Sequence, residues 1–201
     1  MKWLTPILPY LAVGLGLFWF HNAWSALLGF HCAILISLFF ARPQIPIKIL
    51  FRTNDLRWLL LSILLCGSSG ISLYFLRPSF GITNDLPAQV QALGLTKSAW
   101  SGFIAYFVLV NPFVEEYFWR GFLGNPTHGF YISDFLYAGF HALVLIDRVQ
   151  ISTIIYSLVL LVLAGWFWRQ ITREDKGLLA PVLGHMAADF TILLAVYQMA
   201  F

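Results

Sequence analysis

Charged side chains are scarce in this sequence. Only 10% of the 201 residues are Asp, Glu, Lys or Arg, and 60% are hydrophobic. Because a soluble domain contains about 25% charged residues, this composition excludes an ordinary soluble protein and indicates an integral protein of the lipid bilayer. The formal net charge is only +3. We therefore expect no nucleic-acid partner and interpret the basic residues as signals of membrane topology.

Cysteine is also scarce. The two cysteines, Cys32 and Cys66, both lie inside apolar runs, which is typical of small buried side chains rather than of a disulfide or a metal site. The first apolar run is not followed by the small-residue cleavage site of a secretory signal peptide. We therefore expect this run to be retained as a membrane span.

Long apolar runs predict an all-α fold, a polytopic transmembrane helical bundle of about seven spans. A chain of 201 residues is too short for two membrane domains, so we expect one bundle. A short interfacial helix is expected near residues 86–95. The expected spans are residues 3–20, 23–41, 58–76, 99–123, 134–146, 151–168 and 178–199.

The distribution of Lys and Arg predicts the orientation. With seven spans, alternate loops share a side, so the basic residues fall into two groups. One group holds Lys2, Arg42, Lys48, Arg52, Arg57, Arg120, Arg169, Arg173 and Lys176, and the other holds Arg77, Lys97 and Arg148. The positive-inside rule then predicts a cytoplasmic N-terminus and an external C-terminus. Leaving out Arg120 as a structural residue does not change this assignment.

A cluster of charge interrupts the fourth span. Residues 110–123 read VNPFVEEYFWRGFL and include Glu115, Glu116 and Arg120. A charge at the centre of a membrane helix costs roughly 2.5–3.5 kcal/mol and commonly marks a functional site. Glu116 and Arg120 are four residues apart, so the Arg is expected to neutralise this Glu. Glu115 is left without an intrahelical partner.

Other polar residues are expected at the same depth. His141 lies about two turns into the fifth span, and His185 and Asp189 share one face of the seventh. With a rise of 1.5 Å per residue, these groups lie roughly 8–15 Å below the cytoplasmic surface. We interpret Glu115 as a general base for water, with His141 sharing its proton, and the His–Asp pair as the site of an oxyanion or a leaving group. The pattern indicates hydrolysis.

Structural roles explain some of these residues equally well. A single buried Glu–Arg pair or a single intramembrane His often serves packing alone, and we assign His31 to such a role. His21 and His128 lie in loops and receive no role. Pro112 removes a backbone hydrogen bond and predicts a kink, and Asn111 is assigned to the carbonyl that this frees.

Three motifs resemble those of one family. Residues 115–120 match E-E-x-x-x-R, residues 137–141 match F-x-x-x-H with Tyr in place of Phe, and residues 185–189 match H-x-x-x-N with the variant Asp. Their order and spacing over residues 99–201 resemble the CPBP family, which comprises the type II CAAX prenyl endopeptidases and the bacteriocin-processing proteins, also called the Abi family.

The resemblance implies an intramembrane endopeptidase of the glutamic type. Glu115 would activate water with the help of His141, and His185 and Asp189 would form the oxyanion site. The supporting structural residues would be Glu116 and Arg120. No cofactor is expected, although two His and a Glu leave zinc as a second alternative.

The resemblance also implies where and on what the protein acts. The substrate would be a membrane-associated or lipidated protein or peptide, cleaved in a prokaryotic cell membrane at a site that opens toward the cytoplasm. Residues 99–201 would form the catalytic helical core, and residues 1–98 would be accessory transmembrane helices. Seven helices can form a bundle without a second copy, so the oligomeric state stays open. The alternative function is a non-proteolytic immunity or scaffold protein that retains the fold.

Overall fold

The computed structural model describes residues 2–82 and 85–201 and is all-helical over these residues. The fold class expected from the sequence is confirmed. The α-helices are α1 (Ile7–Gly14), α2 (Ala23–Ala41), α3 (Leu56–Phe75), α4 (Leu86–Ala92), α5 (Lys97–Glu116), α6 (Ile132–Leu145), α7 (Ile151–Asp175) and α8 (Leu179–Ala200). Shorter 3-10 or π-helical segments are η1 (Lys2–Leu4), η2 (Leu15–Trp19), η3 (Ile47–Phe51) and η4 (Tyr117–Phe122).

The helices are those of a multi-pass membrane protein. Within the described residues, α2, α3, α7 and α8 are long and apolar enough to cross a bilayer. The pair α4 and α5–η4, bent by 75°, adds a fifth candidate if it is counted as one span. Two of the seven expected spans, α1–η2 and α6, form shorter apolar helices of 10–17 residues. The expectation of about seven spans is compatible with this set.

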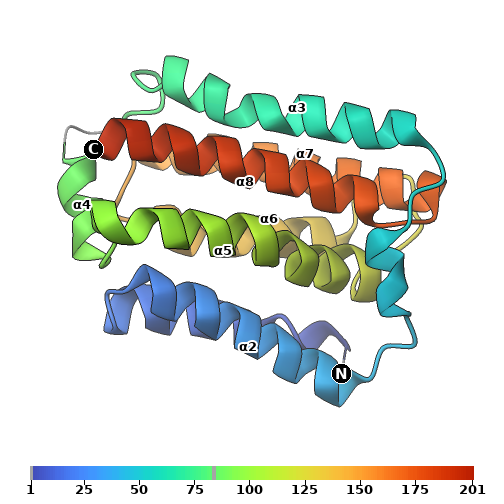
Figure 1. The fold of residues 1–201 in the computed structure, drawn as a ribbon. Coiled ribbons are helices and arrows are strands. Elements are labelled where there is room, and N and C mark those ends of the chain that lie inside the picture. The colour runs from blue at the N-terminus through green and yellow to red at the C-terminus, as the bar shows by residue number, and fades with distance from the viewer. Residues whose placement is uncertain (1, 83–84) are drawn as a thin grey trace.

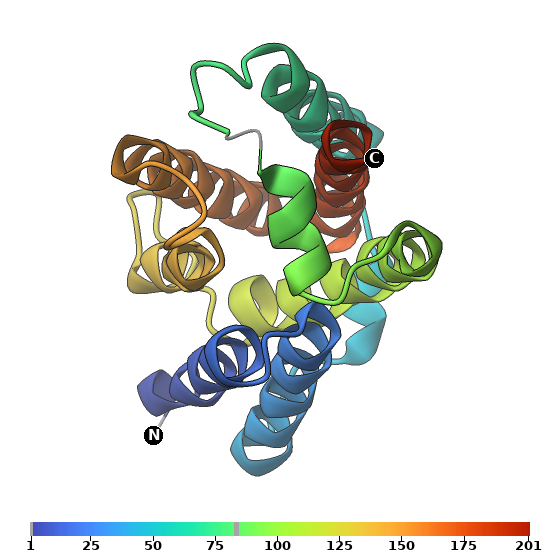
Figure 2. The ribbon, with the colours of Figure 1, turned by 90° about the vertical axis from the view of Figure 1, so that its left-hand side faces the viewer.

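The long helices lie side by side along one axis (Figure 1). Viewed from one end, the α1–α2 hairpin lies on one side of the bundle, and α3 and α8 lie on the opposite side (Figure 2). α5 packs against α8, and α6 packs against α7. Figure 1 also shows that α3 and α8 begin at the end of the bundle where α2 and α5 finish. The first motif, at the end of α5, and the third motif, in the first turns of α8, therefore lie toward the same end of the bundle.

Small residues allow α3 and α8 to approach closely. A Cβ atom on Gly184 of α8 would clash with the side chain of Ser62 on α3, and one on Gly70 of α3 would clash with the backbone of Thr191. Close approach through small residues is the usual way in which membrane helices gain packing contacts, because lipid tails are as apolar as the helix surfaces. This interface fixes α8, and therefore the third motif, against α3.

A buried loop contact fixes the beginning of α8. Asp175, at the end of α7, is 1% exposed and accepts hydrogen bonds from the backbone N–H groups of Asn54 and Asp55 at 2.7 and 2.8 Å. The backbone N–H of Leu178 donates to the carbonyl of Ile49 at 2.9 Å. The basic loop between α2 and α3 is thereby joined to the turn that precedes the third motif.

Candidate active site

The first motif begins in the last turn of α5. Glu115 and Glu116 are buried, with 2% and 0% exposure. The indole Nε1 of Trp119 donates to Oε2 of Glu115 at 3.1 Å. Nη1 of Arg120 lies 3.2 Å from Oε1 of Glu116. The ion pair expected from the spacing of four residues is present, and Glu115 has a hydrogen-bond donor that the charge pattern did not indicate.

Aromatic rings surround the Arg120 guanidinium. Its Cζ lies 3.9 Å from the ring centroid of Tyr137 and 5.0 Å from that of Trp168. A cation over an aromatic face is stabilised by the ring quadrupole, most strongly where water is excluded. Arg120 itself lies in η4, a π-helical segment that continues α5. Single π-turns within helices frequently occur at functional sites.

The third motif on α8 contacts the first motif directly. Nδ1 of His185 lies 2.8 Å from Oε1 of Glu116, and Nε2 lies 3.5 Å from Oδ1 of Asp189. The imidazole also stacks on Trp168, with a centroid distance of 4.9 Å. Because the oxygen of an ionised Glu116 can only accept, Nδ1 is the donor. The other ring nitrogen is then directed to the Asp189 carboxylate.

Five of the six residues predicted to lie at one depth are joined by contacts. Glu115 interacts electrostatically with both His185 and Asp189, which completes the set. The contacts run between α5–η4 and α8, so residues more than sixty positions apart in the sequence meet in the bundle. The five residues are Glu115, Glu116, Arg120, His185 and Asp189.

His141 lies beside this cluster. Its Nδ1 donates to the carbonyl of Tyr137 in its own helix at 3.1 Å, so Nε2 is the unprotonated nitrogen of the neutral ring. The Tyr137 ring lies 5.4 Å from His141 and 6.1 Å from His185, measured between centroids. His141 also interacts electrostatically with His185 and Arg120. Within the part of the chain that the structure describes, no hydrogen bond joins it to Glu115.

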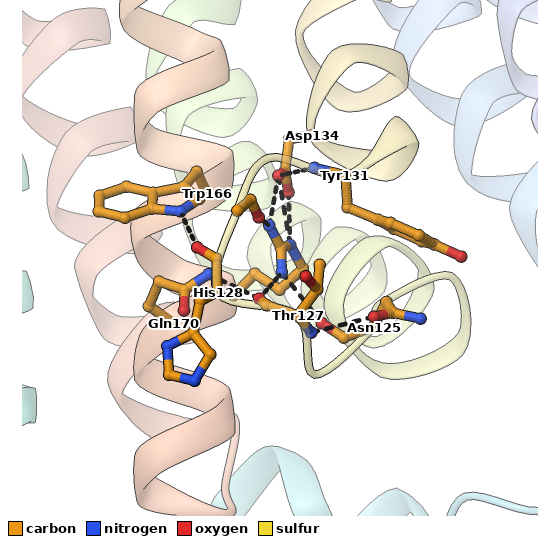
Figure 3. Close-up of polar contacts among 9 residues, drawn as sticks. Asn125, Thr127, His128, Tyr131, Asp134, Trp166 and Gln170 are labelled. Carbon is orange, nitrogen blue, oxygen red and sulfur yellow. Dashed lines mark hydrogen bonds and ion pairs between the residues drawn. The ribbon is translucent and has the colours of Figure 1, made fainter.

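A second buried ion pair fixes the loop between the first two motifs (Figure 3). Arg169 of α7 is 3% exposed and binds Asp134 of α6 through Nε and Nη2, the latter at 2.7 Å. Its remaining donors reach the backbone carbonyls of Asn125, Thr127 and Gly129 at 3.0, 2.6 and 2.5 Å. The sequence indicated Arg169 only as a topology signal, because its partners lie far from it in the chain.

Two neighbours of Arg169 hold the same loop. Nε1 of Trp166 donates to the carbonyl of His128 at 2.8 Å, and Nε2 of Gln170 donates to that of Thr127 at 3.2 Å. One face of α7 therefore binds the segment that joins η4 to α6, and this fixes the position of the second motif relative to the first.

The three motifs also match a known family. Residues 97–191 match the family model described as type II CAAX prenyl endopeptidase Rce1-like. The matched segment is just under half of the chain, and it supports the resemblance to the CPBP family. The matched region begins at the first residue of α5 and includes all three motifs. Proteins of this family are proteases, that is, peptide hydrolases. No curated protein and no solved structure matches the chain.

Two side chains at this candidate site were not identified from the sequence as site residues. Nε2 of His31 lies 2.9 Å from Oδ1 of Asn111, and Nδ2 of Asn111 donates to Oδ2 of Asp189 at 3.3 Å. The hydrogen bonds of the Asn111 side chain in the described structure thus run to other side chains. The sequence had predicted a bond to the backbone carbonyl freed by Pro112. The only signals in the sequence were an Asn one turn before Glu115 and a His in an apolar run.

Zinc ligands are not grouped in the part of the chain that the structure describes. No three His, Cys, Asp or Glu side chains of residues 2–82 and 85–201 are arranged to hold a metal ion. Nδ1 of His185 is bonded to Glu116, and Nδ1 of His141 is bonded to its own helix. As they are arranged in the described structure, these residues do not form a ready zinc site.

Proposed function

We propose that the chain hydrolyses a peptide bond in a membrane-associated or lipidated protein or peptide, using water activated by Glu115. The observation that carries this proposal is the environment of Glu115, a carboxylate of 2% exposure beside His185 and Asp189. One of its oxygens accepts the Trp119 indole N–H, which fixes the carboxylate without transferring a proton to it. A fixed, buried carboxylate is suited to act as a general base.

The reaction then proceeds in two steps. Glu115 takes a proton from water as the oxygen attacks the carbonyl carbon, which forms a tetrahedral oxyanion. Nδ1 of His185 stays bonded to Glu116, so Nε2, which lies 3.5 Å from Asp189, is the nitrogen that donates to this oxyanion. Asp189 balances the charge of the imidazolium. The bond to the leaving amine breaks as the amine receives the proton held by Glu115, and Nε2 of His141 assists this transfer. Glu116 and Arg120 have a structural role, since they pair with one another and Glu116 fixes the His185 ring by accepting from Nδ1.

Membrane placement follows from the charge distribution. We propose a prokaryotic cell membrane with the N-terminus in the cytoplasm and the site opening toward the cytoplasm. The support is that the first motif ends α5 at the same end of the bundle as the basic loop of residues 42–57. A substrate whose cleavable end lies at the cytoplasmic surface could reach Glu115 by entering only part of the bilayer.

A peptide probe tests the reaction. The purified protein is given a synthetic peptide with a farnesylated Cys three residues from its C-terminus, and release of the tripeptide is followed by mass spectrometry. Glu115→Gln should lower the rate by about a hundredfold or more, since general base catalysis typically contributes 10²–10⁴-fold. The matched control is Glu174→Gln, an exposed Glu whose loss should leave the rate unchanged. Equal rates for Glu115→Gln and the wild type would remove the assignment of Glu115 as the base.

Excess chelator provides a second arm of this assay. The glutamate mechanism uses no metal, so the rate should be unchanged. A loss of activity that zinc restores would favour the zinc alternative.

A cellular comparison tests the function without assuming a substrate. Protein termini are profiled in cells that carry the wild type, Glu115→Gln or a deletion. A fragment absent from both altered strains identifies a protease and its substrate. A phenotype of the deletion that Glu115→Gln reverses would instead support the non-proteolytic immunity or scaffold function.

A further inference from the structure

Asn111 connects the two acidic residues of the candidate site. It is 1% exposed and lies one helical turn before Glu115. Its Nδ2 donates to Oδ2 of Asp189, and the same amide interacts with the Glu115 carboxylate. An amide nitrogen carries two hydrogens, so it can serve two carboxylates at once. Asn111 is therefore a bridge between α5 and α8 at the reacting groups.

His31 fixes the direction of this amide. The ring is 3% exposed, with Nε2 at 2.9 Å from Oδ1 of Asn111 and Nδ1 at 3.0 Å from the hydroxyl of Tyr106. Because an amide oxygen only accepts, Nε2 carries the proton, and in the neutral ring the Tyr106 hydroxyl donates to Nδ1. A reversed amide would place its NH₂ against this N–H and its oxygen against the carboxylates. The acceptor-only Asp189 carboxylate and this tautomer of His31 together disfavour the reversed orientation.

Two neighbouring carboxylates repel one another unless a donor lies between them. Within the described residues, the other polar contact of the Asp189 side chain is the 3.5 Å approach to Nε2 of His185. We propose that Asn111 is a positioning residue, which holds Glu115 and Asp189 in their reactive arrangement, and that His31 acts through it. The inference rests on the proposed hydrolysis at the same site. It also gives α2, which carries none of the three motifs, a part in the reaction.

A double-mutant cycle tests the bridge by activity. Asn111→Asp replaces the donor with an acceptor of the same shape, and it should lower kcat on the farnesylated peptide about tenfold to a hundredfold with little change in KM. In an Asp189→Asn background, Asn111→Asp leaves one amide donor and one carboxylate acceptor in exchanged positions. The loss of kcat caused by Asn111→Asp should therefore be at least tenfold smaller in this background than in the wild type. Independent effects of the two substitutions on kcat would overturn the proposal, because residues that share a hydrogen bond in the reacting arrangement are expected to show coupling.

Histidine NMR tests the same bridge without a substrate. In protein with ¹⁵N-labelled histidine, the His185 ring signals should move in Asn111→Leu and in His31→Leu, although the hydrogen bonds of His31 in the described structure run to Tyr106 and Asn111 and not to His185. His31→Gln keeps an N–H donor and should retain the wild-type signals. The control is Ser37→Ala, a buried polar residue of α2 that bonds the carbonyl of Thr5 away from the site. Unmoved His185 signals in Asn111→Leu would overturn the proposal.

The two experiments distinguish failure of the inference from failure of the function. If the wild type cleaves the probe in a Glu115-dependent way while coupling and signal shift are absent, the positioning role is wrong and the hydrolysis stands. If the signals move as expected but no probe is cleaved, the bridge stands and the proposed reaction on this probe is wrong.

Discussion

At the scale of single residues, Arg120 explains how a cation is tolerated inside the bundle. Its guanidinium has an anionic partner in Glu116 and lies over the rings of Tyr137 and Trp168. Glu116 in turn accepts from His185. Each charged group therefore has a partner of opposite charge or a π-face, which offsets part of the cost of removing it from water.

Removal of the Arg120 side chain should destabilise the protein. Arg120→Ala leaves Glu116 buried beside a single partner, and breaking a buried ion pair from one side costs about 3–5 kcal/mol. We expect a lower Tm in detergent and poorer expression. Arg57→Ala, which removes an exposed cation of 90% side-chain exposure, should change the Tm little. A loss of activity with an unchanged Tm would show that Arg120 takes part in the chemistry.

At the scale of elements, the contact between α3 and α8 fixes the third motif. The two helices approach so closely that a methyl group on Gly70 has no room beside the Thr191 backbone. Because Thr191 follows Asp189 by two residues, a displacement of α8 at this contact also moves the site.

Gly70→Ala should therefore destabilise the bundle by about 1–3 kcal/mol, the usual cost of overpacking. Gly102→Ala is the matched control, because a methyl group at this helical glycine of α5 meets no atom within 4 Å. The control should be neutral or slightly stabilising, since Ala favours a helix over Gly by roughly 0.5–1 kcal/mol. Thermal unfolding in detergent measures both. Equal Tm values for the two variants would contradict the close contact.

The loop between η4 and α6 depends on Arg169. Arg169→Lys keeps the charge but loses the planar fork that binds Asp134 and three backbone carbonyls at once. Amides of residues 124–131 should then exchange with deuterium about tenfold faster or more. Arg173→Lys, at an ion pair whose Glu174 partner is half exposed, should leave their exchange unchanged. Equal protection in the two variants would show that the loop is held by other contacts.

At the scale of the whole molecule, the basic residues define one end of the bundle. α3 and α8 begin at this end, and α5 reaches it with the first motif (Figure 1). The positive-inside rule predicts that this end faces the cytoplasm. The predicted orientation decides from which side a substrate reaches the site.

Cysteine labelling tests the orientation. In a Cys32→Ala, Cys66→Ala background, Lys97→Cys should react with a membrane-impermeant maleimide in intact cells. Arg57→Cys should react only after the cells are permeabilised. Both parent side chains are exposed in the structure, so accessibility differs only by the side of the membrane. The reverse labelling pattern would place the candidate site at the external face.

Local patterns were sufficient for most of the elements and for the contacts within the first and third motifs. Apolar runs predicted the helices because the bilayer requires every backbone polar group to be satisfied within a helix. The spacing of four residues predicted that Glu116 pairs with Arg120 and that His185 lies beside Asp189. The π-helical segment η4 was not predicted, since the choice between α and π geometry depends on the packing of Phe118 and Trp119 in the core.

The sequence by itself determined that this chain is a helical membrane protein with ionisable groups at one depth, because composition and helical periodicity are local properties. Only the tertiary structure decided which of those groups meet. Asn111 bonds His31 across eighty positions, and Arg169 reaches Asp134 across thirty-five. Such pairings depend on how the helices pack and on the need of each buried polar atom for a hydrogen-bond partner. The spacing of residues along the chain does not predict them.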